Sequence, residues 1–213
     1  VTAARDLDTY AAYGMTTVYS LGGEPPDVFA ARRAQGSPAQ ARARVFVAGP
    51  VITATTPDEA RTQVAAVAAQ QVDIAKIRVD DNLGTATKMP PEVYRVVIDE
   101  AHRHKLRLAA HLFYLDDAKL LLAAGADLVA HSVRDADVDD AVIRALKARA
   151  ICVSPTLMRE VSTFVYESTP DFFGDSLFLT HANREWMATL REPARQDAMR
   201  RSTSAQRYKA ALT

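Results

Sequence analysis

The amino-acid sequence predicts an α/β fold: a TIM-type (β/α)8 barrel that is only partly present. Short apolar runs alternate with amphipathic helical segments, and no two runs are joined by a hairpin signal. This alternation builds a parallel sheet, because parallel strands need a long crossover connection. Each strand–helix unit takes about 20–35 residues, as expected for a right-handed βαβ unit. The 213 residues can bury a sizeable core.

Six strands are expected, near residues 15–21, 44–48, 72–79, 106–111, 127–131 and 150–154. A closed barrel of this type needs eight strands. We therefore expect the second to seventh strands in this chain and the first and last outside it. The alternation ends near residue 156. Residues 156–213 are expected to form an irregular segment and a helical tail of the same domain, which spans residues 1–213.

The first elements follow from local signals. From Ala3 to Tyr13 apolar residues recur at helical spacing, and Gly14 suits the left-handed residue that ends a helix. The β-branched run from Met15 to Leu21 is typical of a strand and stops at Gly22. A polar helix is expected over residues 27–35.

Later helices carry clearer end signals. Thr56 is a good N-cap, because a proline follows it and Glu59 stands three residues on. Two prolines open the helix that begins near Pro91. Gly125 is expected to end a helix over residues 115–124. A last helix of this part is expected over residues 137–149.

The composition excludes several classes of protein. Lys plus Arg and Asp plus Glu number 26 each, so nothing favours nucleic acid or an anionic membrane as partner. No apolar run approaches the length that spans a bilayer. The single cysteine, Cys152, excludes an internal disulfide framework, and we expect a buried, inert thiol on an apolar strand.

Three nitrogen-bearing side chains stand in otherwise apolar strands: Lys76, His111 and His131. Parallel strands place their carboxyl ends on one side of the sheet, where ligands bind. His111 and His131 end neighbouring strands and are expected to converge there. A buried ammonium costs several kcal/mol, so Lys76 must lose its proton or find a partner such as Asp73 or Asp80. Taken singly, each histidine could also be an ordinary core residue.

Two further residues are candidates for substrate binding. Tyr114 lies three residues after His111, and Arg134 three residues after His131, so both enter the loops that follow the strands. A packing role for Tyr114, and an ion pair of Arg134 with Asp135 on the rim, are the structural alternatives.

Several stretches of this sequence resemble the amidohydrolase superfamily, in particular its imidazolonepropionase-like and prolidase-like branch. They are VDIAKI (72–77), MPPEVYRVVIDEAHRHKLRLAAH (89–111) and LLAAGADLVAHS (121–132), with GMTTVYSLGG (14–23) and VSPTL (153–157) in the expected places. The resemblance covers the chain from Ala3 to about Leu157. Their joint order and spacing is specific, whereas no single stretch is.

The resemblance implies a site and a chemistry. In that family the fourth-strand lysine is often carboxylated and bridges two divalent metals, commonly zinc, and histidines that end strands five and six are metal ligands. By position these are Lys76, His111 and His131. The family implies an enzyme that hydrolyses C–N bonds of small amides, cyclic amides or dipeptides with metal-activated water.

Two parts of the family pattern have no counterpart in this sequence. They are the His-x-His of the first strand and the aspartate of the eighth strand, which shuttles the proton. The residue that moves the proton is therefore not assigned, and the chain alone is expected to be incomplete for catalysis. An open sheet also exposes its edges, so we expect an oligomer or completion by another chain segment.

Two other functions stay open at this stage. One is a non-catalytic barrel fragment or scaffold, which at most binds a metal weakly. The other is a lyase or isomerase in which Lys76 forms a Schiff base with a carbonyl substrate.

Overall fold

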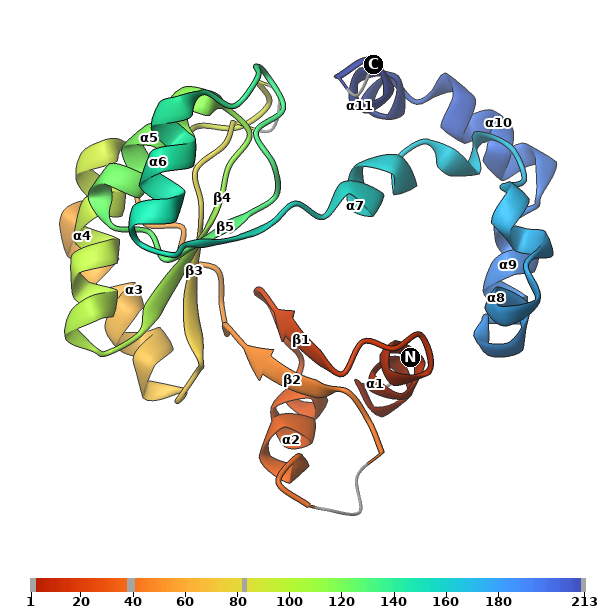
Figure 1. Cartoon of the computed structure of the whole chain (residues 1–213), viewed down its shortest axis with the longest axis horizontal. Helices are drawn as coiled ribbons and strands as arrows, with labels where there is room; N and C mark the ends of the chain where they lie inside the picture. The colour runs from red at the N-terminus through yellow and green to blue at the C-terminus, as the bar shows by residue number, and fades with distance from the viewer. Residues whose placement is uncertain (1–2, 38–40, 82–83, 212–213) are drawn as a thin grey trace. The chain divides into compact units, whose positions relative to one another are not determined.

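The computed structural model describes residues 3–37, 41–81 and 84–211. The chain divides into two compact units, one ending at Pro155 and one beginning at Thr156, and each is described by itself (Figure 1). That both units belong to one domain stays a prediction.

The first unit alternates strands and helices. Its strands are β1 (Thr17–Ser20), β2 (Arg44–Val47), β3 (Ile74–Arg78), β4 (Arg107–His111), β5 (Leu128–Ala130) and β6 (Cys152–Ser154). Its helices are α1 (Ala3–Ala12), α2 (Pro26–Ala34), α3 (Pro57–Ala69), α4 (Pro91–Arg103), α5 (Leu115–Ala124) and α6 (Asp140–Ala148). Each strand lies within a range expected from the sequence.

All strand pairs are parallel and follow the order of the chain. β1 pairs with β2, and β3 to β6 form a four-stranded sheet. An isolated parallel bridge between Ile52 and Ile77 links the segment after β2 to β3. The prediction of an α/β fold with parallel strands is confirmed. The described residues form two parallel sheets, and the closed eight-stranded barrel stays a proposal.

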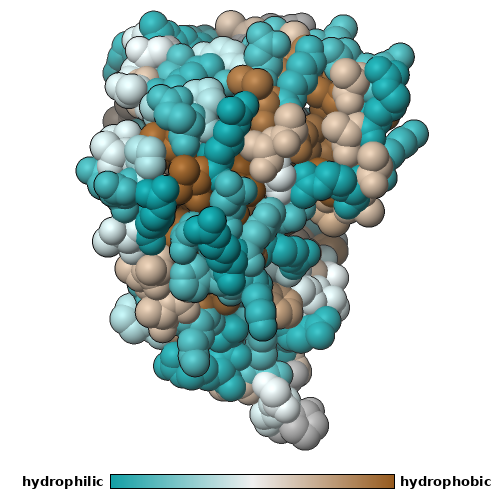
Figure 2. Space-filling view, turned by 90° about the vertical axis from the view of Figure 1, so that its left-hand side faces the viewer, coloured by the Kyte–Doolittle hydropathy of each residue, from teal (hydrophilic) through white to brown (hydrophobic). Residues whose placement is uncertain are grey.

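The two faces of the four-stranded sheet have different roles. Helices α3 to α6 cover one face (Figure 1), where Ile77, Leu108 and Val129 join the main core. Ile74 and Ala109 lie on the opposite face in a small second cluster. Residues that alternate with period two share a face, so Lys76 lies on the same face as Ile74. Seen from this side, the surface is mainly hydrophilic, with hydrophobic residues in patches among the hydrophilic ones (Figure 2).

Helix ends form largely as the sequence predicts. The Thr56 hydroxyl accepts a hydrogen bond from the Glu59 amide at 3.2 Å. The Glu59 carboxylate accepts from the amide of Thr55 at 2.8 Å, one residue before the position expected for a capping box. None of the described helices is long and apolar enough to cross a bilayer.

Cys152 is exposed, so the prediction of a buried thiol is wrong. β6 is the last strand in the order of its sheet and pairs with β5 on one side. Such an edge strand is covered less than its apolar composition suggests.

The second unit consists of short helices. They are α7 (Leu157–Ser162), η1 (Val165–Glu167), η2 (Asp171–Gly174), α8 (Ser176–His181), α9 (Arg184–Leu190), α10 (Pro193–Arg201) and α11 (Thr203–Ala211). A small core of Phe173, Met187 and Leu190 holds them, with Phe172 and Phe178 packed against it. The predicted helical tail is thus helical, and the segment before it forms short α-helices and 3-10 turns.

Gly125→Ala is expected to lower the free energy of unfolding by about 1–2 kcal/mol. Gly125 caps α5 with a φ of 113°, a left-handed conformation that costs a residue with a Cβ atom. An added Cβ would also lie 3.2 Å from Ile98 Cγ2. Urea unfolding measures the change.

Gly36→Ala is the matched control, because a Cβ there meets open space and its φ is not left-handed. Equal stability changes for the two variants would contradict the assignment.

Candidate functional site

Lys76 places an amine in an unusual setting near the carboxyl end of β3. The residue is 5 % exposed. Among the described residues Nζ has no hydrogen-bond partner. Burial, followed by the nearby charge of Arg78, lowers the pKa of Lys76 to about 8. A large share of the amine is therefore uncharged near pH 8, and an uncharged amine is a nucleophile.

The acids considered as partners of Lys76 bind other groups. Asp73 accepts two hydrogen bonds from Arg32, each at 2.6 Å. Asp80 accepts from Arg78 Nε at 2.6 Å and pairs with His111 Nε2 at 2.8 Å. The alternative in which Lys76 forms an ion pair with either acid is therefore wrong.

His111 and His131 come together. Their ring centroids are 4.2 Å apart, with the rings inclined at 68°. His111 ends β4 and pairs in register with Ala130, so His131 stands one residue beyond that register. Simple alternation would turn His131 to the other face of the sheet. A left-handed φ of 76° at His131 departs from the strand conformation, and its ring meets His111. Strain of this kind in a residue with a Cβ is typical of functional sites.

Asp80 orients His111. The carboxylate is buried, and although burial acts to raise its pKa, hydrogen bonds from His111 and Arg78 outweigh this and hold it well below the usual range. Burial lowers the pKa of His111, and the Asp80 carboxylate only partly opposes this effect. A neutral His111 that donates from Nε2 to Asp80 has its lone pair on Nδ1.

The sequence offered Asp80 only as a partner for Lys76, not as the partner of His111. A signal was present, since Asp80 follows Lys76 by four residues and the strand alternation puts both on one face. Asp80 has the side chains of Lys76, Arg78 and His111 nearby. Which of them it binds depends on side-chain geometry, which strand alternation does not predict.

Tyr114 and Arg134 lie close to the site but are engaged by the protein. The Tyr114 hydroxyl donates to Asp81 at 2.7 Å, which is the main cause that raises the pKa of Tyr114 to about 12. The Lys88 amine lies 3.8 Å from the centre of the Tyr114 ring. Arg134 donates to the carbonyl of Leu112 at 2.8 Å. Their roles in substrate binding stay predictions.

Asp135 contacts the start of a helix that lies earlier in the chain. Its carboxylate accepts from the Leu115 amide at 2.8 Å, at the start of α5. This contact gives Asp135 a role other than the ion pair with Arg134 considered from the sequence.

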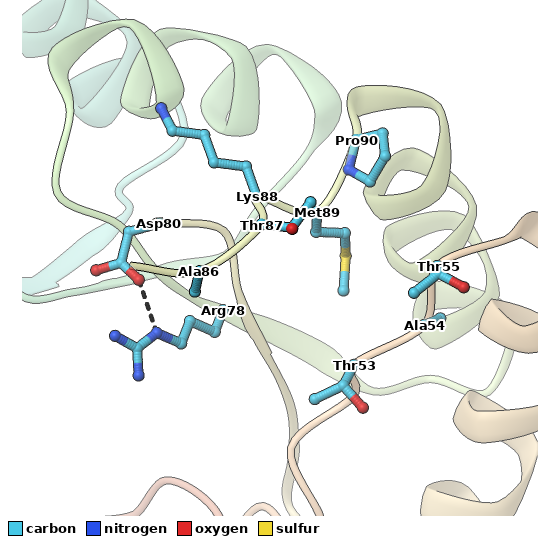
Figure 3. Close-up of a pocket in the computed structure, with 10 residues that line it drawn as sticks. All are labelled: Thr53, Ala54, Thr55, Arg78, Asp80, Ala86, Thr87, Lys88, Met89 and Pro90. Atoms are coloured by element: carbon cyan, nitrogen blue, oxygen red, sulfur yellow. Dashed lines mark hydrogen bonds and ion pairs between the residues drawn. The ribbon is translucent and has the colours of Figure 1, made fainter. Parts of the chain in front are cut away.

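A cavity of about 350 Å³ opens beside Asp80 (Figure 3). It lies between the segment after β2 and the loop that leads to α4. Its lining residues are Thr53, Ala54, Thr55, Arg78, Asp80, Ala86, Thr87, Lys88, Met89 and Pro90. Arg78 and Asp80 thus belong both to the cavity wall and to the polar chain that reaches His111.

The metal-ligand set is small. Within the part of the chain that the structure describes, no three His, Cys, Asp or Glu side chains are grouped to hold a metal ion. The two imidazoles alone would be a weak site, because catalytic zinc takes about three protein ligands. A third donor would have to come from Lys76, and the role of all three residues as ligands stays a prediction.

Comparisons with known proteins show where this fold occurs. No family model and no curated protein sequence matches the chain. Among solved structures, a Xaa-Pro dipeptidase matches with a TM-score of 0.64, 18% identity and coverage of 96% of this chain and 55% of that protein. An amidohydrolase matches with a TM-score of 0.62, 16% identity and coverage of 95% and 54%.

Phenylurea hydrolase B matches with a TM-score of 0.59, 16% identity and coverage of 75% and 48%. The chain is therefore similar in fold to part of these hydrolases and spans about half their length. At the level of fold, the resemblance to amidohydrolases and prolidases is confirmed.

Asp80→Asn is expected to lower the pKa of His111 further. The carboxylate stabilises the imidazolium, so its loss favours the neutral ring and moves the titration to lower pH. Nuclear magnetic resonance titration of the His111 ring measures the shift. Asp117→Asn, which removes the partner of Lys88, is the control and should leave the His111 titration in place. A higher pKa in Asp80→Asn would contradict this account.

Lys76→Met is expected to raise the free energy of unfolding at pH 7 by about 3 kcal/mol. The pKa of Lys76 falls from 10.5 to about 8 on folding, so the penalty is complete below pH 8. As pH rises from about 8 to 10.5 the folded chain binds fewer protons than the unfolded chain, and the penalty is relieved. The advantage of the variant should shrink over that window.

Urea unfolding in CO2-depleted buffer with a chelator measures this difference for the free amine. Lys119→Met removes a surface lysine paired with Asp139 and should change stability much less. A destabilised Lys76→Met protein under these conditions would show that Lys76 is not a buried unpaired amine.

Proposed function

We propose that this chain supplies part of the active site of a metal-dependent hydrolase of C–N bonds. The observation that supports this most is the buried amine of Lys76, which has no partner among the described residues. It lies near the carboxyl ends of parallel strands, where α/β enzymes bind their ligands. The adjacent strands bring the paired rings of His111 and His131 to this end.

The residues present fit a divalent metal, provided that Lys76 becomes an oxygen donor. The uncharged amine can attack CO2, which forms an N–C bond and releases one proton to solvent. The resulting carbamate is an anion on a long arm and would remove the cost of a buried unpaired amine. Two imidazoles and one carboxylate-like group form a donor set that suits zinc.

His111 would use one ring nitrogen to contact Asp80 and the other to bind an ion. Nε2 is held by Asp80, so Nδ1 is the nitrogen that would bind an ion. A carboxylate behind a ligating histidine fixes its orientation and raises its basicity. With His131 and carboxylated Lys76, the chain would hold one or two ions, zinc foremost. The ion, when bound, would polarise the scissile carbonyl and make bound water acidic enough to react near pH 7.

The similar structures support C–N bond hydrolysis as the reaction. Their names describe a Xaa-Pro dipeptidase, an amidohydrolase and a phenylurea hydrolase. A dipeptide, an amide and a phenylurea share a carbonyl carbon bonded to nitrogen. We therefore propose small amides, cyclic amides or dipeptides as substrates.

In the protein that carries this sequence, chelation is expected to abolish hydrolysis of dipeptide and amide substrates, and added zinc to restore it. His111→Ala and Lys76→Met should each lower the rate more than about 100-fold, beyond the loss usual for residues that only support a ligand. Metal analysis should show a matching loss of bound zinc. His102→Ala is the control, because His102 lies at the end of α4 and pairs with Asp127.

Three outcomes would argue against this proposal. Full hydrolysis in chelator would exclude a metal, and absence of both zinc and activity would favour the scaffold. The lowered pKa of Lys76 also suits a Schiff-base amine. Trapping of a carbonyl substrate on Lys76 by borohydride, with activity that resists chelator, would favour the lyase or isomerase.

A further inference from the structure

The segment that follows β5 begins with a backbone conformation that needs support. His131 has a left-handed φ of 76°. Its amide still donates to the Ser154 carbonyl of β6 at 2.8 Å. A residue with a Cβ atom keeps such a conformation only where the surrounding contacts hold it. The contacts at the other end of this short segment therefore help to fix where the His131 ring lies.

Arg134 ties the segment after β5 to the segment after β4. Its amide donates to the Phe113 carbonyl at 2.9 Å, and its Nη2 donates to the Leu112 carbonyl at 2.8 Å. Its guanidinium carbon lies 4.5 Å from the centre of the Phe113 ring. Leu112 and Phe113 directly follow His111, and both are buried. The backbone and the side chain of Arg134 thus both hold the chain that leaves the His111 strand.

Asp135 adds a contact to the same segment. Its carboxylate accepts a hydrogen bond from the Leu115 amide at 2.8 Å. Arg134 and Asp135, which together we call the brace, therefore bind three residues within four positions of His111. The brace joins the backbone that follows one candidate ligand to the backbone that follows the other.

We propose that the brace positions the two candidate histidine ligands, and that Arg134 is its main residue. It holds the segment after His131 on the segment after His111, so that the two rings meet. Their centroids are 4.2 Å apart, although strand alternation would turn the rings to opposite faces of the sheet. Arg134 acts through His131 and not on the substrate. This inference rests on the proposed function and adds to it the residue that sets the spacing of two ligands.

A guanidinium suits this task better than an ammonium does. It is planar, so one face can stack on the Phe113 ring while an N–H at its edge donates to the Leu112 carbonyl. An ammonium is a compact donor without such a face. The position of Arg134 after β5 also suggested a contact with substrate, and the two roles predict different effects of its loss.

A simpler role for Arg134 is to stabilise the fold, and Arg149 shows what such a contact looks like. Arg149 donates to the carbonyls of Leu122 at 3.1 Å and Gly125 at 2.9 Å. These carbonyls precede β5, so Arg149 holds the end of the sheet opposite to the histidines. Arg149→Met is therefore the matched control, because it removes the same kind of contact at the other end of the strand.

The test compares Arg134→Met with Arg149→Met in the protein that carries this sequence. Nuclear Overhauser effects between the two imidazoles report the ring contact without metal, and competition with a chelator reports zinc affinity. Arg134→Met is expected to lose the ring contact and to bind zinc at least 10-fold more weakly, as is usual when a group that orients a ligand is removed. Arg134→Lys should recover part of this affinity. Arg149→Met should keep both properties.

Ring contact and zinc affinity that are the same in Arg134→Met as in Arg149→Met would overturn the proposal. A raised KM with unchanged zinc affinity would also overturn it, because that result indicates substrate binding by Arg134. If Arg134→Met does not fold, Asp135→Ala decides, since Asp135 is exposed and its loss removes one contact of the brace. An unchanged ring contact in Asp135→Ala would then overturn the proposal.

Failure of this inference and failure of the proposed function give different results. Zinc-dependent hydrolysis that Arg134→Met leaves unchanged removes the brace alone. Loss of the ring contact in Arg134→Met, in a protein that binds no zinc and hydrolyses no C–N substrate, supports the brace and removes the hydrolase.

Discussion

The buried amine of Lys76 is the constraint on which the rest of the site depends. A lysine near the carboxyl end of a strand buried on both faces has no solvent to stabilise its charge, and its pKa falls to about 8. The fall corresponds to about 3 kcal/mol, a large fraction of the stability of an ordinary domain. The apolar core on the helix-covered face of the sheet must offset this cost. A side chain that costs this much and contacts no partner among the described residues is best explained by chemistry.

The arrangement around Lys76 follows from strand parity. Lys76, Arg78 and Asp80 alternate onto one face of β3, and the parallel register places His111 beside Arg78. The Asp80 carboxylate then contacts His111 on the neighbouring strand and also accepts a hydrogen bond from Arg78. The site is thus held mainly by paired backbone segments, which position side chains more firmly than a free loop does.

The sequence predicts the parts of this structure that depend on local or periodic signals. The strands follow from apolar runs between helices, and the left-handed end of α5 from Gly125. The placement of His111 and His131 at the same end of the sheet follows because parallel strands end on one side. Other features depend on tertiary contacts. Strand parity alone would place His131 on the other face of the sheet. Its left-handed φ cannot be predicted from the sequence, because a non-glycine residue rarely adopts this conformation.

Cys152 and the cavity also depend on tertiary contacts. Local composition predicts a buried thiol, but the place of β6 in the sheet decides its exposure. The cavity is formed by two segments far apart in the chain, Thr53–Thr55 and residues 86–90, which no periodic pattern relates. Asp80 is predictable only in part. Strand parity gives the face of the sheet on which it lies, whereas its hydrogen-bond partners depend on side-chain geometry.

The position of the candidate ligands limits what this chain could do with an ion. Lys76, His111 and His131 come from three adjacent strands, which span about 10 Å at the usual spacing of about 4.8 Å. The register places His111 on the same face as Lys76, and the ring of His131 meets His111 there. A tetrahedral ion needs donors spread around it, so at least one position must be filled from the opposite side. Water, a substrate carbonyl or a further polypeptide segment could each take that position. If polypeptide takes it, the site would be completed by another chain segment or subunit.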